Sequence, residues 1–69
     1  MSKLEKFREL FDDTAPESIL PETNFREIEE WGSLLSFSFI AMAKDDFGIQ
    51  LTGEEIIKST TVQDLLDLL

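Results

Sequence analysis

Trp31-Gly32-Ser33-Leu34 joins an acidic segment to the most apolar run of the chain, and the rest of the sequence is arranged around this junction. A serine directly before an apolar periodic run is a natural helix N-cap, because its hydroxyl can accept a hydrogen bond from a free backbone N–H of the first turn. The sequence therefore predicts that a helix starts here with Ser33 as its exposed cap. By itself, such a serine indicates a cap and no chemistry.

The run from Ser33 to about Phe47 is the longest helix candidate. At about 100 degrees per residue, its apolar side chains surround most of the helix axis. A helix of this kind is central to its bundle or keeps part of its surface for a ligand or partner. We expect a central helix with one partly exposed apolar strip, with Met42 in the core and Gly48 as the left-handed stop.

Upstream, a capping-box pattern of Ser2 and Glu5 predicts a helix from Ser2 to about Phe11. Pro16 and Pro21 then interrupt any helix. The segment 13–32 would be a long connection, but its apolar residues predict an ordered loop with a helical turn around residues 25–30. The residues expected to hold this loop on the bundle are Ile19, Leu20, Phe25, Ile28 and Trp31. The acidic cluster of Glu27, Glu29 and Glu30 fits a solvated turn or a docking site equally well.

Downstream, Thr52-Gly53-Glu54-Glu55 is a second capping-box pattern that opens a short helix through about Lys58. Thr61 starts a final amphipathic helix. The sequence thus predicts an all-α bundle of three longer helices plus one short helix, with a long ordered first loop, in a single domain over residues 1–69. The expected core consists of Leu4, Phe7, Leu10, Phe25, Trp31, Leu35, Phe39, Ile40, Phe47, Val62, Leu65 and Leu66.

The composition limits the functions open to the chain. Its 69 residues contain no cysteine, histidine or tyrosine, which removes the common metal ligands, the thiolate nucleophile and the usual general base, so we expect no metal site and no enzyme activity. Fifteen acidic against six basic residues give a net charge of −9, which repels nucleic acids and anionic membranes and favours basic partners. Without an apolar signal or spanning segment, we expect a soluble, monomeric, cytoplasmic protein.

The layout of four unequal helices, a long first loop and a serine followed by leucine at the start of the second helix resembles the acyl carrier protein family from end to end. The segment Asn24 to Leu34 is similar to the approach to the family's D-S-L attachment motif, with Ser33 and Leu34 matching and Gly32 in place of the aspartate. Later stretches fall where the family has the end of helix two, helix three and the opening of helix four. These are Phe47-Gly48-Ile49, Leu51, Glu54-Glu55 and Thr60-Thr61-Val62.

The resemblance implies that a phosphopantetheinyl transferase attaches a 4′-phosphopantetheine arm from coenzyme A to the Ser33 hydroxyl, with Gly32 and Leu34 beside it. Acyl groups would ride on this arm as thioesters to acyl-activating, acyl-transferring or condensing enzymes of a fatty-acid, polyketide or other specialised pathway. A helix N-terminus also suits a phosphodiester. The resemblance further implies a surface that binds basic partner enzymes, formed by Leu34, Asp45, Asp46, Glu54 and Glu55.

Gly32 departs from the family pattern, because it removes a negative charge that the family uses when its transferase binds. The stretch Leu35 to Phe39 also lacks the acidic residues of fatty-acid synthesis carriers, which favours a specialised pathway. Two alternatives remain at this point. One is a carrier-like acidic interaction module that is never modified, and the other is an unrelated acidic helical adaptor whose apolar strip grips a partner helix.

Overall fold

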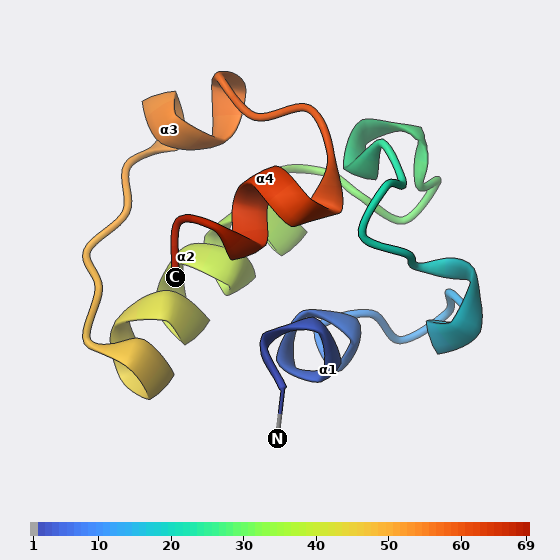
Figure 1. Cartoon of the computed structure of the whole chain (residues 1–69), viewed down its shortest axis with the longest axis horizontal. Coiled ribbons are helices and arrows are strands. Elements are labelled where there is room, and N and C mark those ends of the chain that lie inside the picture. Colours follow the sequence, from blue (N-terminus) through green and yellow to red (C-terminus); the bar gives the residue numbers. More distant parts are fainter. Residues whose placement is uncertain (1) are drawn as a thin grey trace.

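A computed structural model of the chain describes residues 2–69, and within this range the fold is built from helices (Figure 1). The expected all-helical bundle with an ordered first loop is confirmed. Its elements are α1 (Lys3–Arg8), the 3₁₀ turns η1 (Pro16–Ser18) and η2 (Phe25–Glu27), α2 (Ser33–Phe47), α3 (Gly53–Ile57) and α4 (Val62–Leu66). Across residues 2–69, no helix is both long enough and apolar enough to cross a membrane.

α2 is the only long helix of the described chain, with 15 residues against six in α1 and five each in α3 and α4. α1 and α4 are therefore shorter than expected, because each leaves the α conformation in a turn before its apolar pattern ends. α2 crosses behind α4, and α3 lies at the edge of the molecule (Figure 1). The predicted bounds of α2 are confirmed, as is its stop at Gly48, which has a φ of 67°.

Hydroxyl side chains start three of the four helices, as the capping patterns predict. The backbone N–H of Glu5 donates to Ser2 Oγ at 3.1 Å in α1, and the N–H of Asp64 donates to Thr61 Oγ1 at 3.2 Å in α4. Thr52 accepts from the Glu55 N–H in the same way at the start of α3. These bonds satisfy donors that the first turn leaves without a helical partner.

The N-cap of α2 differs from the prediction by one residue, although the helical range itself is the predicted one. Gly32 is the N-cap and Ser33 is the first helical residue, so the prediction that Ser33 caps this helix is wrong. The reason is that the first backbone bond of the helix runs from the Ser36 N–H to the Gly32 carbonyl, at 2.9 Å. Gly32 has no side chain with which to cap, and α2 therefore starts without a side-chain cap.

An aromatic cluster forms the centre of the core. Phe7 is fully buried, and its ring centroid lies 5.3 Å from that of Phe11, 5.7 Å from that of Phe39 and 6.2 Å from that of Trp31. The Trp31 ring also meets Phe25 edge to face, at 4.9 Å. Such offset and edge-to-face pairs stabilise beyond the area they bury. The cluster joins α1, the first loop and α2.

All the expected core residues belong to the core, at different depths. Seven are buried, namely Phe7, Phe25, Leu35, Phe39, Val62, Leu65 and Leu66, and the others are partly buried against them. Met42 is in the core as predicted, and Ile19 is buried as a loop anchor. The expected list omits Phe11, Ala43, Leu51 and Ile56, which are also buried. Leu20 is exposed, so its predicted role as a loop anchor is wrong; its N–H donates to Thr23 Oγ1 in a surface turn.

The first loop is fastened to α1 by side chains that bond to its backbone. Arg8 donates from Nε and Nη2 to the Ile19 carbonyl at 3.0 and 2.9 Å. From the other end of the loop, the Glu30 carboxylate accepts hydrogen bonds from the Asp12 and Asp13 N–H groups at 2.8 and 3.0 Å and from Thr14 at 2.7 Å. Glu30 is therefore a structural link between the two ends of the loop.

The same loop is fastened to α4 through its own carbonyls. The N–H groups of Val62 and Gln63, in the first turn of α4, donate to the carbonyls of Thr23 and Pro21, both at 2.8 Å. Loop and helix thus satisfy each other's backbone groups. The predicted helical turn is present as η2, and the long connection is ordered because its backbone has partners on two helices.

We predict that Phe39→Ala lowers the free energy of unfolding by about 3 to 5 kcal/mol, because a fully buried aromatic ring leaves a cavity when truncated. The control is Phe37→Ala on the same helix, since the Phe37 side chain is 70% exposed. Urea denaturation followed by circular dichroism measures both. Equal midpoints for the two variants would contradict the assignment of Phe39 to the core.

The second prediction concerns the Glu30 link. Hydrogen bonds, of which the one from the Asp12 N–H contributes most and the one from Thr14 next, hold the pKa of the Glu30 carboxyl below its usual range. A carboxyl with a lowered pKa stabilises the fold above its unfolded-state pKa, about 4.3, and this contribution is lost as pH falls through the lower folded-state pKa. Glu30→Gln should therefore be less stable than the parent at neutral pH, and the difference should shrink in acid.

Urea midpoints of the parent and Glu30→Gln, measured from neutral pH to well below the usual carboxyl pKa, test this expectation. Glu29→Gln, at an exposed neighbouring position, is the matched control. A stability difference that stays constant over the whole pH range would mean that the ionised Glu30 carboxylate does not fasten the loop.

Candidate functional site

Ser33 lies at the first position of α2, exposed to solvent. Two features of the chain place it there. Trp31, two residues earlier, is held in the aromatic cluster against Phe7 and Phe25. Gly32 then continues in an extended conformation, with φ −173° and ψ −167°, and brings the chain out to the surface. The predicted site residue is thus a hydroxyl presented at the start of the longest helix.

A hollow of about 430 Å³ opens beside Ser33, between the first half of α2 and α3. Trp31, Ser36, Phe37 and Ile40 line one side, and Gly53, Ile56 and Ile57 line the other. Gly32, Ser33 and Arg26 complete the lining. Apolar side chains form most of its wall, so the hollow suits a hydrocarbon group reached from Ser33.

Three large apolar side chains near this site are exposed. Leu34 is 79% exposed, Phe37 70% and Ile57 73%. Phe37 and Ile57 face the hollow from α2 and α3, whereas Leu34 is not among its lining residues. The partly exposed apolar strip expected on α2 is therefore present.

The start of α2 offers hydrogen-bond donors that no side chain uses. Since the first helical bond begins at the Ser36 N–H, the N–H groups of Ser33, Leu34 and Leu35 have no acceptor within the helix. The cap residue Gly32 supplies no side-chain acceptor, and the first turn contains no acidic residue. Free N–H groups and the positive end of the helix dipole favour an anion such as a phosphodiester at this position.

Gly32 is not required by the backbone. Its φ lies in the extended region that any residue adopts, and a Cβ added to it would meet no atom within 4 Å. An aspartate at this position therefore fits the fold without strain. Compared with an aspartate, the glycine removes a negative charge beside Ser33. The backbone conformation at this position is one that other residues can also adopt.

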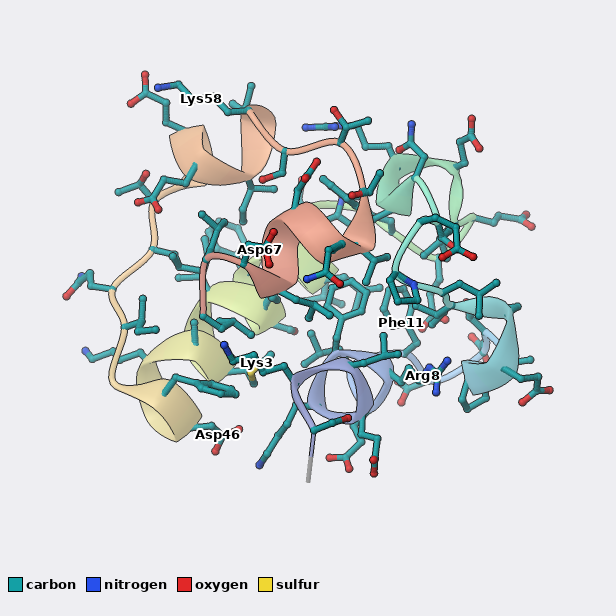
Figure 2. The ribbon with its side chains drawn as sticks, viewed as in Figure 1. Lys3, Arg8, Phe11, Asp46, Lys58 and Asp67 are labelled. Carbon is teal, nitrogen blue, oxygen red and sulfur yellow. The ribbon has the colours of Figure 1, made fainter. Side chains whose placement is uncertain are left out.

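The predicted acidic surface falls into two separate parts. Asp45 and Asp46 lie in the last turn of α2, and twelve residues of helix place Asp45 about 18 Å from Ser33 along the axis. Asp46 pairs with Lys6 of α1 at 3.4 Å. Glu54 and Glu55 lie in the first turn of α3, next to the hollow. Figure 2 shows this separation: Asp46 lies at the lower left of the view, and Lys58, which directly follows α3, lies at the upper left.

Two of the acidic residues have structural partners. Besides the Asp46–Lys6 pair, Thr52 Oγ1 accepts from the Glu55 N–H and donates to the Glu55 carboxylate, both at 3.4 Å. Asp45 and Glu54 are exposed. Of the predicted partner-binding residues, Leu34, Glu54 and Glu55 are each adjacent in sequence to a residue that lines the hollow, whereas Asp45 and Asp46 are not.

Sequence reasoning did not identify Arg26 as a residue of the site. Arg26 lines the hollow and donates to backbone carbonyls at the end of α3, 30 to 33 residues away. The only signal in the sequence is a single cation within the acidic segment Glu22 to Glu30. A lone charge of this kind does not indicate its partner when that partner is the backbone.

Comparison with known proteins shows the family of the chain. The profile of the family described as "Phosphopantetheine attachment site" matches residues 4–69. An acyl carrier protein from Thermosynechococcus vestitus (strain NIES-2133 / IAM M-273 / BP-1) is 36% identical to this chain over an alignment 69 residues long. The alignment covers 96% of this chain and 85% of that protein. No solved structure matches the chain significantly.

The two matches extend over nearly the whole chain, and the fold has the expected helices in the expected order. Domains of this kind carry 4′-phosphopantetheine as a covalent prosthetic group and are carriers, not catalysts. The exposed Ser33 hydroxyl, the free N–H groups of the first turn of α2 and the adjoining apolar hollow fit such a group. The chain belongs to the acyl carrier protein family.

Proposed function

We propose that Ser33 carries the 4′-phosphopantetheine arm and that the protein delivers acyl groups to the enzymes of a biosynthetic pathway. The observation that carries the proposal is the exposed Ser33 hydroxyl at the uncapped start of α2, on the rim of an apolar hollow. When bound, the arm supplies a thiol that holds the acyl group as a thioester. The chain has no cysteine of its own for this purpose.

The residues around Ser33 have two tasks in this function. The N–H groups at the start of α2 stabilise the negative charge of the phosphodiester. The hollow between α2 and α3 shields the hydrocarbon part of the acyl group from water, because burying apolar surface is favourable by roughly 25 cal/mol per Å². Phe37 and Ile57, exposed at the rim, gain most from contact with a hydrocarbon chain or a partner.

The surface of α2 favours a specialised fatty-acid, polyketide or related pathway over housekeeping fatty-acid synthesis. From Ser33 to Ala43 the helix contains no charged residue, and its exposed positions include Leu34 and Phe37. Partner enzymes that dock beside Ser33 meet an apolar surface there, with acidic residues at the opposite end of α2 and on α3. Such partners combine an apolar contact with basic residues at its edge.

The partners that fit are a phosphopantetheinyl transferase and acyl-activating, acyl-transferring or condensing enzymes with basic docking surfaces. The net charge of −9 supports this class and opposes binding to nucleic acid or to anionic membranes. The composition fits a monomeric cytoplasmic carrier.

A second function remains, because Gly32 stands where the family has an aspartate. A carrier-like module that is never modified would keep the fold and the acidic surface and act by binding proteins. The two functions differ in one measurable property, which is whether Ser33 is modified.

We predict that the protein gains the mass of phosphopantetheine in the presence of coenzyme A and a transferase, and that Ser33→Ala does not. Gly32→Asp should accelerate the reaction, since the new carboxylate can form a charge-assisted contact with a basic group of the transferase, worth about 1.5 to 3 kcal/mol. If the contact forms in the transition state, the rate rises roughly tenfold to a hundredfold. Intact-mass time courses measure the three proteins.

The same substitution has a structural control. An aspartate cap on α2 should raise stability by about 0.3 to 1 kcal/mol, because a negative charge at the N-terminus interacts favourably with the helix dipole. Equal modification rates for the parent and Gly32→Asp would show that the transferase does not recognise the side chain at position 32. Absence of any mass gain in both proteins, beside a standard carrier that is modified, would favour the unmodified module.

We also predict that the acidic residues without structural partners steer the transferase. The double variant Asp45→Lys with Glu54→Lys should slow association at low salt, and the difference from the parent should shrink as ionic strength rises. Stopped-flow association rates measure this effect. Glu17→Lys with Glu22→Lys, which has the same change in net charge at exposed positions of the first loop, is the control. Equal slowing in both double variants would mean that only net charge matters.

A further inference from the structure

Arg26 connects the first loop to the end of α3. Its Nη1 donates to the Ser59 carbonyl at 2.6 Å, and its Nη2 donates to the carbonyls of Ile56 and Ile57, both at 2.9 Å. The carbonyls of Ile56 and Ile57 lie in the last turn of α3, and that of Ser59 lies just beyond it. The Ile56 carbonyl also accepts the Ser59 N–H at 3.0 Å, so Arg26 adds bonds from a distant residue to the local turn that ends the helix. A cation at this end also interacts favourably with the helix dipole.

The base of this contact packs on the core. The guanidinium carbon lies 4.6 Å from the centroid of the Phe25 ring, within the range of a cation–π contact. Phe25 is fully buried and packs edge to face on Trp31. Arg26 therefore extends from the aromatic cluster, and its head group holds α3 relative to the core.

α3 has few other attachments. A helix of five residues is too short to be stable alone, and Ile56 is its only buried residue. The Thr52 cap acts at the opposite end and within the same segment. The Ser59 hydroxyl, which donates to the Glu55 carbonyl at 3.0 Å, is likewise a local contact. Arg26 thus supplies the long-range polar bonds of the α3 C-terminus.

α3 is also one wall of the hollow. Gly53, Ile56 and Ile57 face Ser36, Phe37 and Ile40 of α2 across it. The separation of the two helices sets the room available beside Ser33, and Arg26, which itself lines the hollow, holds the α3 side.

We propose that Arg26 is a positioning residue that fixes α3 against α2 and thereby sets how long an acyl chain the hollow shields. This inference rests on the proposed carrier function and adds to it a residue that determines which acyl groups are protected. Arginine suits the task because its planar fork reaches three carbonyls from one side chain, whereas the single ammonium of lysine cannot hold them in the same geometry.

Arg26→Gln and Arg26→Lys test the proposal, with Arg8→Gln as the matched control. Arg8 also donates to a backbone carbonyl, that of Ile19, but it lies across the molecule from Lys58, the residue that follows α3 (Figure 2). All three variants remove an arginine that bonds to the backbone, and the hollow is lined by Arg26 but not by Arg8.

The first measurement is amide hydrogen exchange on the unmodified protein. The N–H groups of Lys58 and Ser59, which close the last turn of α3, should exchange about tenfold or more faster in Arg26→Gln than in the parent, relative to core amides of α2. Arg26→Lys should give a smaller increase and Arg8→Gln none. Unchanged exchange at both amides in the Arg26 variants would overturn the proposal, whatever the protein carries.

The second measurement is the rate of thioester hydrolysis for carriers loaded from a series of straight-chain acyl-coenzyme A molecules of increasing length. In the parent, hydrolysis should slow as the chain lengthens and fills the hollow. Arg26→Gln should lose this dependence on chain length, Arg26→Lys should partly restore it, and Arg8→Gln should keep it. A length profile that stays unchanged while α3 exchanges faster would overturn the assignment of Arg26 to acyl selection.

The two measurements separate this proposal from the carrier function. If Ser33 cannot be modified by any transferase, the proposed function fails and acyl selection fails with it. The exchange experiment still decides whether Arg26 holds α3. If Arg26→Gln does not fold, Arg26→Lys, which keeps the charge, carries both measurements.

Discussion

The packing of Trp31 against Phe7 and Phe25 is the contact on which the rest of the structure depends. It brings α1, η2 and the entry to α2 to one place, and Phe39 of α2 also packs edge to face on Phe7. Because Ser33 follows Trp31 by two residues, its position is set by the core although it is itself exposed. If Ser33 carries the arm, as proposed, this combination keeps the attachment point accessible and yet fixed in space.

Some apolar side chains of α2 pack in the core, and others line the hollow. Leu35, Phe39 and Ala43 are buried in the core, whereas Phe37 and Ile40 line the hollow. This division explains why the helix is apolar nearly all round although the domain is too small to bury every side chain. The short α3 completes the hollow with few contacts of its own, so a chain of 69 residues forms both a core and an apolar hollow at its surface.

The sequence predicted those features that depend on local chemistry. The bounds of α2, the stop at Gly48 and the hydroxyl caps follow from residue types at short spacings, and the motif around Ser33 identified the family. The cap of α2 was misplaced by one residue because Gly32, with no side chain, gives no signal as a cap. Arg26 and Glu30 were not identified as links because their main partners are backbone groups 17 to 33 residues away. Backbone groups are the same at every position, so no pattern in the sequence indicates them.

The position of Trp31 has a spectroscopic consequence. It is the only tryptophan, the chain contains no tyrosine, and its side chain contributes to both the aromatic cluster and the lining of the hollow. The intrinsic fluorescence of the protein therefore comes almost entirely from one indole two residues before Ser33. Loss of the core shifts the emission maximum toward the longer wavelength of a solvent-exposed indole. Filling of the hollow by an apolar chain shifts the maximum in the opposite direction, so neither measurement needs an added label.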